Sequence, residues 1–305
     1  MLHRFFPARL TIAFVSCISS LGLLAGPGWA QVLFKTNVVT AANSFLAYDA
    51  QIGAYEPPFN TVPTFGVNGM AANDADRVFY AASAAGVLYT VSYDPPYSFT
   101  QVTMSFGAGV VQGLAYDTAN QKLWAYINQT GSNRIVMIDP ATGDADLVST
   151  WSIGSLSGGS NVGGIDYDAD TGIFYLFYNR TNATAEGPFT SGRGLYSFDP
   201  VAQTVLFIAA PPIKTAPSTL ETDIDGVAAG GGYVYLCADE VSFMYPFNLA
   251  TMSYETPISQ TPGISGGGTT AGAAYAPRFF FEEGDLQVTA VGAPAEVFPP
   301  GGNVT

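Results

Sequence analysis

Two short stretches of the sequence carry side chains whose types and spacing suit chemistry. The first, GIDYDADTGIF (164–174), places Asp166, Asp168 and Asp170 at every second position ahead of Gly172. Carboxylate oxygens spaced in this way before a glycine are typical of calcium-binding loops. The same residues also suit a tight turn between two strands, because Asp and Gly are common turn formers.

The second stretch, ETDIDG (221–226), alternates Glu221, Asp223 and Asp225. In an extended segment these side chains would point to one side, where their oxygens could bind Ca²⁺. A pair of such carboxylates could instead hydrolyse a glycosidic bond, one as acid and the other as base or nucleophile. Both interpretations stay open, with calcium the only cofactor that the sequence suggests.

Composition excludes most other catalytic chemistry. The sole histidine, His3, lies in a segment that we expect to be removed, as does Cys17, so that Cys237 is the one remaining cysteine. Serine–histidine triads, cysteine–histidine dyads, histidine-ligated zinc and internal disulfides are therefore excluded. We assign no catalytic residue, and a non-catalytic role is favoured.

The first thirty residues have the order of a secretory signal peptide. Arg4 and Arg9 precede an uncharged apolar run that ends with Gly28 and Ala30 at small-residue positions. A lipoprotein signal at Cys17 is the alternative. The run is too short for a spanning helix, and no later segment approaches that length. The sequence thus predicts export to the cell surface or beyond, with no membrane span.

The exported chain is strongly acidic. Without Arg4 and Arg9, 8 Lys and Arg remain against 24 Asp and Glu, a formal charge of −16. A surface of this sign repels phosphate backbones, so that nucleic acid is excluded as a partner.

The elements that must position these carboxylates repeat along the chain. Short runs rich in Val, Ile, Tyr and Phe alternate with turn residues, which indicates strands. One set of matching strands is marked by a glycine, at steps of 44, 51, 62 and 46 residues: Gly69, Gly113, Gly164, Gly226 and Gly272. A second set runs into a turn at Asp49, Asp94, Asp139, Asp199 and Asn248.

Residues 113–150 form the clearest unit, with four short strands separated by turns. Four antiparallel strands in a unit of roughly 45–50 residues predict an all-β propeller, with a glycine opening the inner strand where backbones crowd together. We expect five blades, or six if residues 31–43 or 204–222 hide a degenerate one. Because the two sets are out of phase, residues 272–281 are expected to supply two inner strands, and residues 44–60 two outer strands, of a blade that closes the ring.

The repeat changes the interpretation of the three aspartates. YDADTG (167–172) occupies the position of YDTANQ (116–121) in the preceding unit, so that Asp168 matches Asp117. A calcium loop counted from Asp166 would need glycine at Thr171 and an acid at Phe177. We therefore expect a hairpin here, which leaves Asp166 as the unexplained carboxylate.

Polar residues at the entries of the inner strands suggest a ligand-binding mouth on one face of the ring. The candidate ligand-binding residues are Asn68, Gln112, Asn161, Asp223 and Asp225, and the weak calcium candidates are Glu221, Asp223 and Asp225. The loop 179–193 is expected to border this mouth. Solvation of a channel entrance is the alternative explanation for the polar residues.

Other side chains have simpler explanations. The strand aromatics are expected to pack between blades rather than to stack on sugars: they are Tyr89, Tyr116, Trp124, Tyr126, Tyr167, Phe174, Tyr175 and Phe177. Three Asn-x-Thr sites, at Asn128, Asn179 and Asn182, match the glycosylation pattern, which matters only in a eukaryotic host.

GLAYDTANQKLWAYI (113–127) and RIVMIDPATGD (134–144) resemble the blades of bacterial secreted propellers with YVTN-type and NHL-type repeats. In the tail, DLQVT (285–289) and GGNVT (301–305) resemble the start of the Ig-like conserved-repeat modules of bacterial surface proteins. The second resemblance implies that the chain is part of a larger surface protein; a solvated stub is the alternative for the tail.

The sequence thus predicts a signal peptide (1–30), a propeller (31–283) and a linker or incomplete Ig-like module (284–305). The favoured function is a non-catalytic binding or structural module of a secreted or cell-surface protein, with an unspecified protein or glycan as its ligand. The alternative is a glycan-active enzyme that uses Asp223, Asp225 and Asp166 near one mouth.

Overall fold

The structure is a computed structural model. It describes residues 31–36, 44–50, 53–55, 59, 66–129, 133–151, 162–180, 189, 191–199, 202, 204–215, 219–238, 243–259 and 270–279. The predicted signal peptide, the predicted Ig-like tail and Asn161 lie outside these residues. Within the described ranges, no helix is long and apolar enough to cross a membrane.

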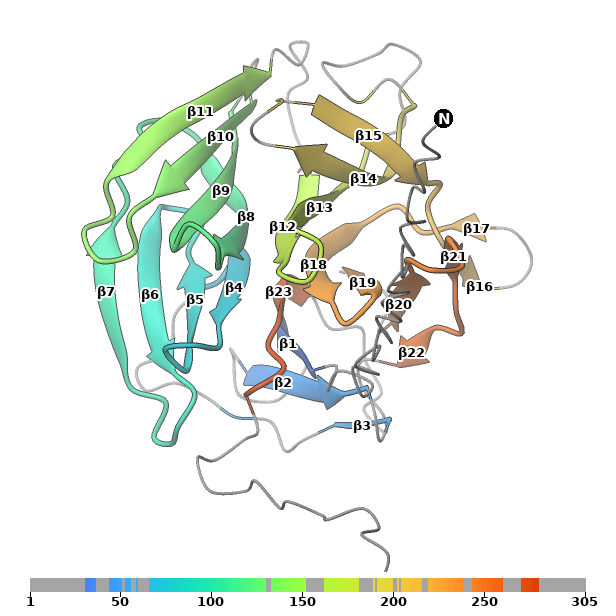
Figure 1. Ribbon diagram of the computed structural model, residues 1–305, viewed down its shortest axis with the longest axis horizontal. Coiled ribbons are helices and arrows are strands. Elements are labelled where there is room, and N and C mark those ends of the chain that lie inside the picture. The colour runs from blue at the N-terminus through green and yellow to red at the C-terminus, as the bar shows by residue number, and fades with distance from the viewer. Residues whose placement is uncertain are drawn as a thin grey trace, which may run out of the picture.

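The described residues form antiparallel sheets of four strands that surround a common centre (Figure 1). Along the chain, the first sheet contains β4 (Gly69–Asn73), β5 (Val78–Ala82), β6 (Val87–Ser92) and β7 (Phe99–Thr103). The second contains β8 (Val110–Asp117), β9 (Lys122–Asn128), β10 (Asn133–Ile138) and β11 (Ala145–Trp151). The third contains β12 (Val162–Asp168), β13 (Ile173–Tyr178), β14 (Gly194–Asp199) and β15 (Thr204–Ala209).

The remaining sheets follow the same plan with small additions. The fourth contains β18 (Ile224–Gly230), β19 (Tyr233–Ala238), β20 (Phe243–Asn248) and β21 (Ser253–Tyr254), with β22 (Ile258–Ser259) also paired to β20. The closing sheet contains β23 (Thr270–Tyr275), β1 (Gln31–Thr36), β2 (Ser44–Asp49) and β3 (Ala54–Tyr55). Between the third and fourth sheets, β16 (Ile213–Thr215) pairs with β17 (Thr219–Leu220) as a separate two-stranded sheet.

The innermost strand of each sheet meets the next around a closed circuit. Each predicted glycine marks one such contact, because a Cβ atom placed on it would collide with the neighbouring strand. A Cβ on Gly69 would lie 2.8 Å from the carbonyl carbon of Gly113, and one on Gly272 would lie 3.1 Å from that of Gly69. Backbones this close leave no room for a side chain, which explains the glycine at this position of every repeat.

Hydrophobic clusters fill the space between successive sheets. The alternation along β2 shows how one strand serves two of them: Phe45 and Ala47 pack toward the first sheet, whereas Leu46 and Tyr48 pack toward the fourth. The aromatic strand residues named above lie in these clusters, either buried or partly buried against them. Their predicted role in packing between sheets is therefore confirmed.

The closing sheet corrects one prediction. Residues 272–281 were expected to supply two inner strands, but within their described part, 272–279, the one strand is the end of β23, and β1 is the second strand of the sheet. β1 pairs with β23 on one side and with β2 on the other. The closure therefore joins one C-terminal strand to three N-terminal strands, and residues 31–36 belong to this sheet rather than to a hidden blade.

The predicted turns are confirmed, and so is the hairpin at the three aspartates. Asp168 Oδ1 accepts a hydrogen bond from the amide of Asp170 (3.0 Å), as Asp117 Oδ1 does from the amide of Ala119 (3.0 Å). Gly172 takes a positive φ of 73°, which suits the left-handed end of the turn. A ring of radially arranged antiparallel sheets, each beginning at the centre, is a β-propeller.

Candidate functional site

The predicted mouth lies where the inner strands begin. Three of these strands carry a one-residue bulge there, at Gln112, Gly163 and Asp225. A bulge re-aims the side chain that it carries, so that Gln112 and Asp225 occupy equivalent, half-buried positions on this face. Asn68 is also half-buried, and its backbone N–H donates to the carbonyl of Ala82 (2.7 Å).

Glu221 does not share this half-exposed position, because it is completely buried. Its carboxylate accepts hydrogen bonds from the amide of Thr222 (2.8 Å) and the hydroxyl of Tyr245 (3.1 Å), and lies 3.3 Å from Lys214 Nζ. Asp223 is half-buried. Among the residues that the structure describes, no three acidic, histidine or cysteine side chains are placed to hold a metal ion together.

The loop expected to border the mouth does connect β13 to β14, and its described residues are anchored to the core. Phe189 is buried and stacks on Tyr178, with ring centroids 4.3 Å apart. The Asn179 side chain donates to the carbonyl of Ile224 (2.8 Å) and accepts from its amide (3.0 Å), which ties the third sheet to the fourth. Asn179 is thus committed to packing, and its glycosylation is excluded by burial.

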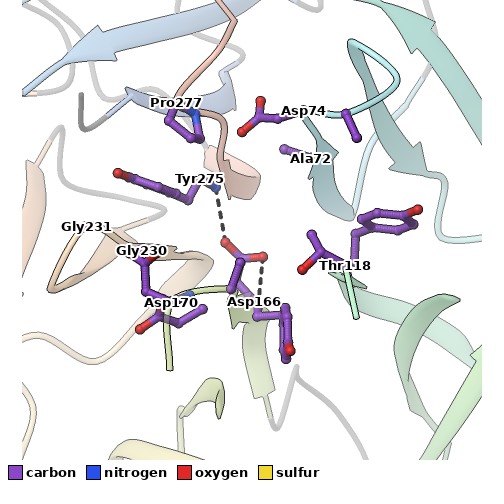
Figure 2. Close-up of a pocket in the computed structure, with 14 residues that line it drawn as sticks. Ala72, Asp74, Thr118, Asp166, Asp170, Gly230, Gly231, Tyr275 and Pro277 are labelled. Carbon is purple, nitrogen blue, oxygen red and sulfur yellow. Dashed lines mark hydrogen bonds between the residues drawn. The ribbon is translucent and has the colours of Figure 1, made fainter. Parts of the chain in front are cut away.

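A pocket of about 250 Å³ lies at the opposite end of the inner strands, in the turns where these strands leave the centre (Figure 2). Each of the sheets around the ring contributes to it. Its acidic lining residues are Asp74, Asp166, Asp168 and Asp170, and its aromatic ones are Tyr116, Tyr167 and Tyr275. Among the described residues, no lysine or arginine lines it. We call it the exit-face pocket.

Asp166 lies in the middle of the exit-face pocket, as Figure 2 shows, although its side chain is buried. Its Oδ2 accepts hydrogen bonds from the amides of Ala229 (2.8 Å) and Tyr275 (3.1 Å), and its Oδ1 accepts one from the amide of Tyr167 (2.9 Å). Burial raises the pKa of Asp166 well above its usual value, and the three amides oppose this shift only in part. Asp166 therefore connects three inner strands across the ring.

The other acidic residues of the pocket differ in how they are satisfied. Asp74 Oδ1 accepts from the hydroxyl of Tyr93 (2.9 Å) and the amide of Arg278 (3.3 Å), and burial raises the pKa of Asp74. Asp168 is buried within its own turn. Asp170 is exposed at the rim, and its carboxylate accepts no hydrogen bond from the described residues.

The structure thus divides the predicted site residues between two faces. Asp223 immediately precedes β18 and Asp225 lies at its start, whereas Asp166 contacts Ala229 near its end, so that these carboxylates do not share one mouth. Sequence reasoning missed Asp74 and the pocket itself. The alternation around Asp166 was the available signal, since an acidic residue stands there where the preceding unit has Ala115.

Comparison with known proteins supports the fold but no family. No protein-family description matches the chain, and no curated protein does. A chain in the crystal structure of a nidogen/laminin complex is similar in fold, with a TM-score of 0.51 and 12% identity over 82% of this chain and 98% of that one. A Bacteroides thetaiotaomicron VPI-5482 protein of unknown function gives a TM-score of 0.49 and 12% identity over 75% of this chain and 58% of that one.

Proposed function

We propose that this chain is the non-catalytic binding module of a secreted or cell-surface protein, and that it binds its ligand in the exit-face pocket. The observation that carries the proposal is the buried carboxylate of Asp166 within that pocket, where all the surrounding sheets converge. Concave sites with a few convergent polar groups are where proteins bind small groups of their partners. By analogy only, the similar chain noted above comes from a complex between two proteins.

Export is part of the proposal. In the structure β1 begins at Gln31, so that cleavage after Ala30 would leave the closing sheet complete. The full chain, expressed in a bacterium with its first thirty residues, should be recovered outside the cytoplasm with Gln31 as its first residue. Intact-mass measurement of the recovered chain checks this; a cytoplasmic product that retains Met1 contradicts it.

The ring is inferred to have five blades and no resident metal. The inner-strand glycines support the blade number, because their contacts run from Gly69 to Gly272 and back. The occupied carboxylate of Glu221 supports the absence of calcium from ETDIDG. We expect the same melting temperature in millimolar Ca²⁺ and in chelator; a rise with Ca²⁺ contradicts the inference.

A glycan-active enzyme is the second candidate, because two carboxyls with raised pKa values, Asp74 and Asp166, line one pocket. Raised carboxyl pKa values are typical of general acids. Both groups, however, hold backbone amides in the fold. A glycan-hydrolysis screen separates the two functions. Measurable turnover by the wild type would contradict the binding module if it is lost in Asp74→Asn. Turnover that is lost in the double variant Asp223→Ala, Asp225→Ala would contradict it equally.

A further inference from the structure

We infer that the exit-face pocket binds a primary ammonium group, either the side chain of a lysine on a partner or a free amine. The inference rests on the proposed function, since it names the class of ligand for the same pocket. It starts from Asp166, because a carboxyl buried without a cationic partner favours its neutral form, and a cation bound beside it would favour its charged form.

Asp166 is buried and has no cationic partner among the described residues. Its three hydrogen bonds come from neutral backbone amides, of Tyr167, Ala229 and Tyr275. The negative charge of Asp168 nearby also raises the pKa of Asp166. In Figure 2 its carboxylate faces the open middle of the pocket. A cation that entered there would supply the missing counter-charge.

Other residues that line the pocket add further carboxylate oxygens that can accept hydrogen bonds. Asp74 Oδ2 accepts no hydrogen bond from the described residues, and Asp170 carries an unpaired carboxylate at the rim. Arg77 and Arg278 act on Asp74 from outside the pocket, and Arg77 is itself paired with Asp94 at 2.6 Å. Asp168 and Asp170 keep the lining acidic, because no lysine or arginine among the described residues lines the pocket.

The aromatic side chains suit an organic cation. Tyr116, Tyr167 and Tyr275 line the same pocket, and tyrosine faces attract ammonium groups. An ammonium group on an alkyl stem can place its charge near the carboxylates and its methylenes against the rings.

Size and spacing favour an ammonium group over the alternatives. The pocket, at about 250 Å³, is smaller than the roughly 300–1,000 Å³ of sites that enclose drug-sized ligands. It therefore fits one end group rather than an oligosaccharide. Protein sites for Ca²⁺ commonly place several carboxylates around one point, and no three acidic, histidine or cysteine side chains are so placed among the described residues. An ammonium group can instead be held by one or two carboxylates, with aromatic rings around its alkyl stem.

Backbone amide NMR provides the test, because the amides of Ala229 and Tyr275 donate to Asp166 and report on it directly. The full exported chain is titrated with n-butylamine at neutral pH, where it is an ammonium ion, and with n-butanol and butyrate as matched neutral and anionic probes. We expect saturable shifts of both amides with the ammonium probe alone. A blocked tripeptide Gly-Lys-Gly and its acetyl-lysine form then separate the sources: tighter binding of the lysine peptide than of butylamine indicates a partner protein.

Two substitutions measure the contribution of the walls. Asp170→Asn removes an exposed rim charge and should weaken butylammonium binding about two- to fivefold. Asp74→Asn removes a more enclosed charge and should weaken it about tenfold or more. Asp146→Asn is the matched control, since Asp146 is exposed on β11 and outside the pocket; it removes the same charge and should leave the affinity within about twofold.

The outcomes separate this inference from the proposed function. Equal shifts with butylammonium and butanol, no shift with either, or saturable shifts with Ca²⁺ instead, would overturn the ammonium site. If a neutral or anionic fragment saturates the same two amides, the ammonium inference fails while the binding module stands. If the probe shifts other amides and leaves Ala229 and Tyr275 unchanged, both fail.

Discussion

Replacing an inner-strand glycine by alanine has two opposing effects on the free energy of unfolding. Gly113→Ala removes conformational freedom from the unfolded chain, which by itself would stabilise the protein by about 0.4–1 kcal/mol. In the folded ring, however, the new Cβ would lie 2.8 Å from the amide nitrogen of Ile165 and 3.1 Å from the Cα of Gly164. Both atoms belong to the neighbouring backbone, which cannot rotate away. Overpacking of this kind costs about 1–3 kcal/mol, so that we expect a net destabilisation of about 1–2 kcal/mol.

Urea unfolding measures the effect, with the midpoint compared at a constant m-value. The matched control is Gly66→Ala: a Cβ on Gly66 meets nothing within 4 Å, and the backbone there does not take the positive φ that disfavours alanine. The control should be unchanged or stabilised by up to about 1 kcal/mol. If Gly113→Ala matches this control, the inner strands are not packed as closely as described and the steric argument is refuted.

Three further predictions concern the ring and its centre. Phe279→Ala empties a buried position in the aromatic cluster between the closing and first sheets, and should cost about 3–5 kcal/mol in urea unfolding; a loss below about 1 kcal/mol contradicts this. Asn179→Ala leaves the buried amide and carbonyl of Ile224 without their side-chain partner and should cost about 2–4 kcal/mol, whereas a surface effect would stay below about 0.5 kcal/mol. Because the pKa of Asp166 is raised in the folded state, its protonation stabilises the fold fully below about pH 4, and this stability is lost as the pH rises through the folded pKa. Relative to Asp166→Asn, the wild type should therefore lose stability as the pH rises above about 4; a stability difference between these two proteins that does not change with pH refutes this prediction.

The fold could be predicted from the sequence because its two repeated signals have local causes. A glycine is required wherever two inner strands meet, and an Asp or Asn begins the turn after a third strand by accepting backbone amides, as Asp139 does from Ala141. The second strand of each sheet carries no comparable signal. β1 was therefore not recognised as a strand of the closing sheet, and the closure was predicted with the wrong division of strands.

The site was harder to predict because a pocket depends on the space that side chains leave. Asp170 is a turn residue by pattern, and Asp74 follows a strand in the same way; nothing in either local sequence shows that the two turns lie at one pocket. Small residues such as Ala72 and Gly230 help to keep that space open. The sequence instead predicted a site at the polar residues of the strand entries, although Glu221 is satisfied within the fold.

The closing sheet also provides a route by which two molecules could exchange a strand. Its strand β23 is about 220 residues from β2 in the sequence and farther still from β1. The first three strands are therefore synthesised well before β23, with which β1 must pair. Until then β1 presents an unpaired edge. A β23 strand from another molecule fits that edge as well as the protein's own, since the pairing is identical. Exchange of this single strand would give domain-swapped dimers without any new interface, and slow closure at high concentration favours it.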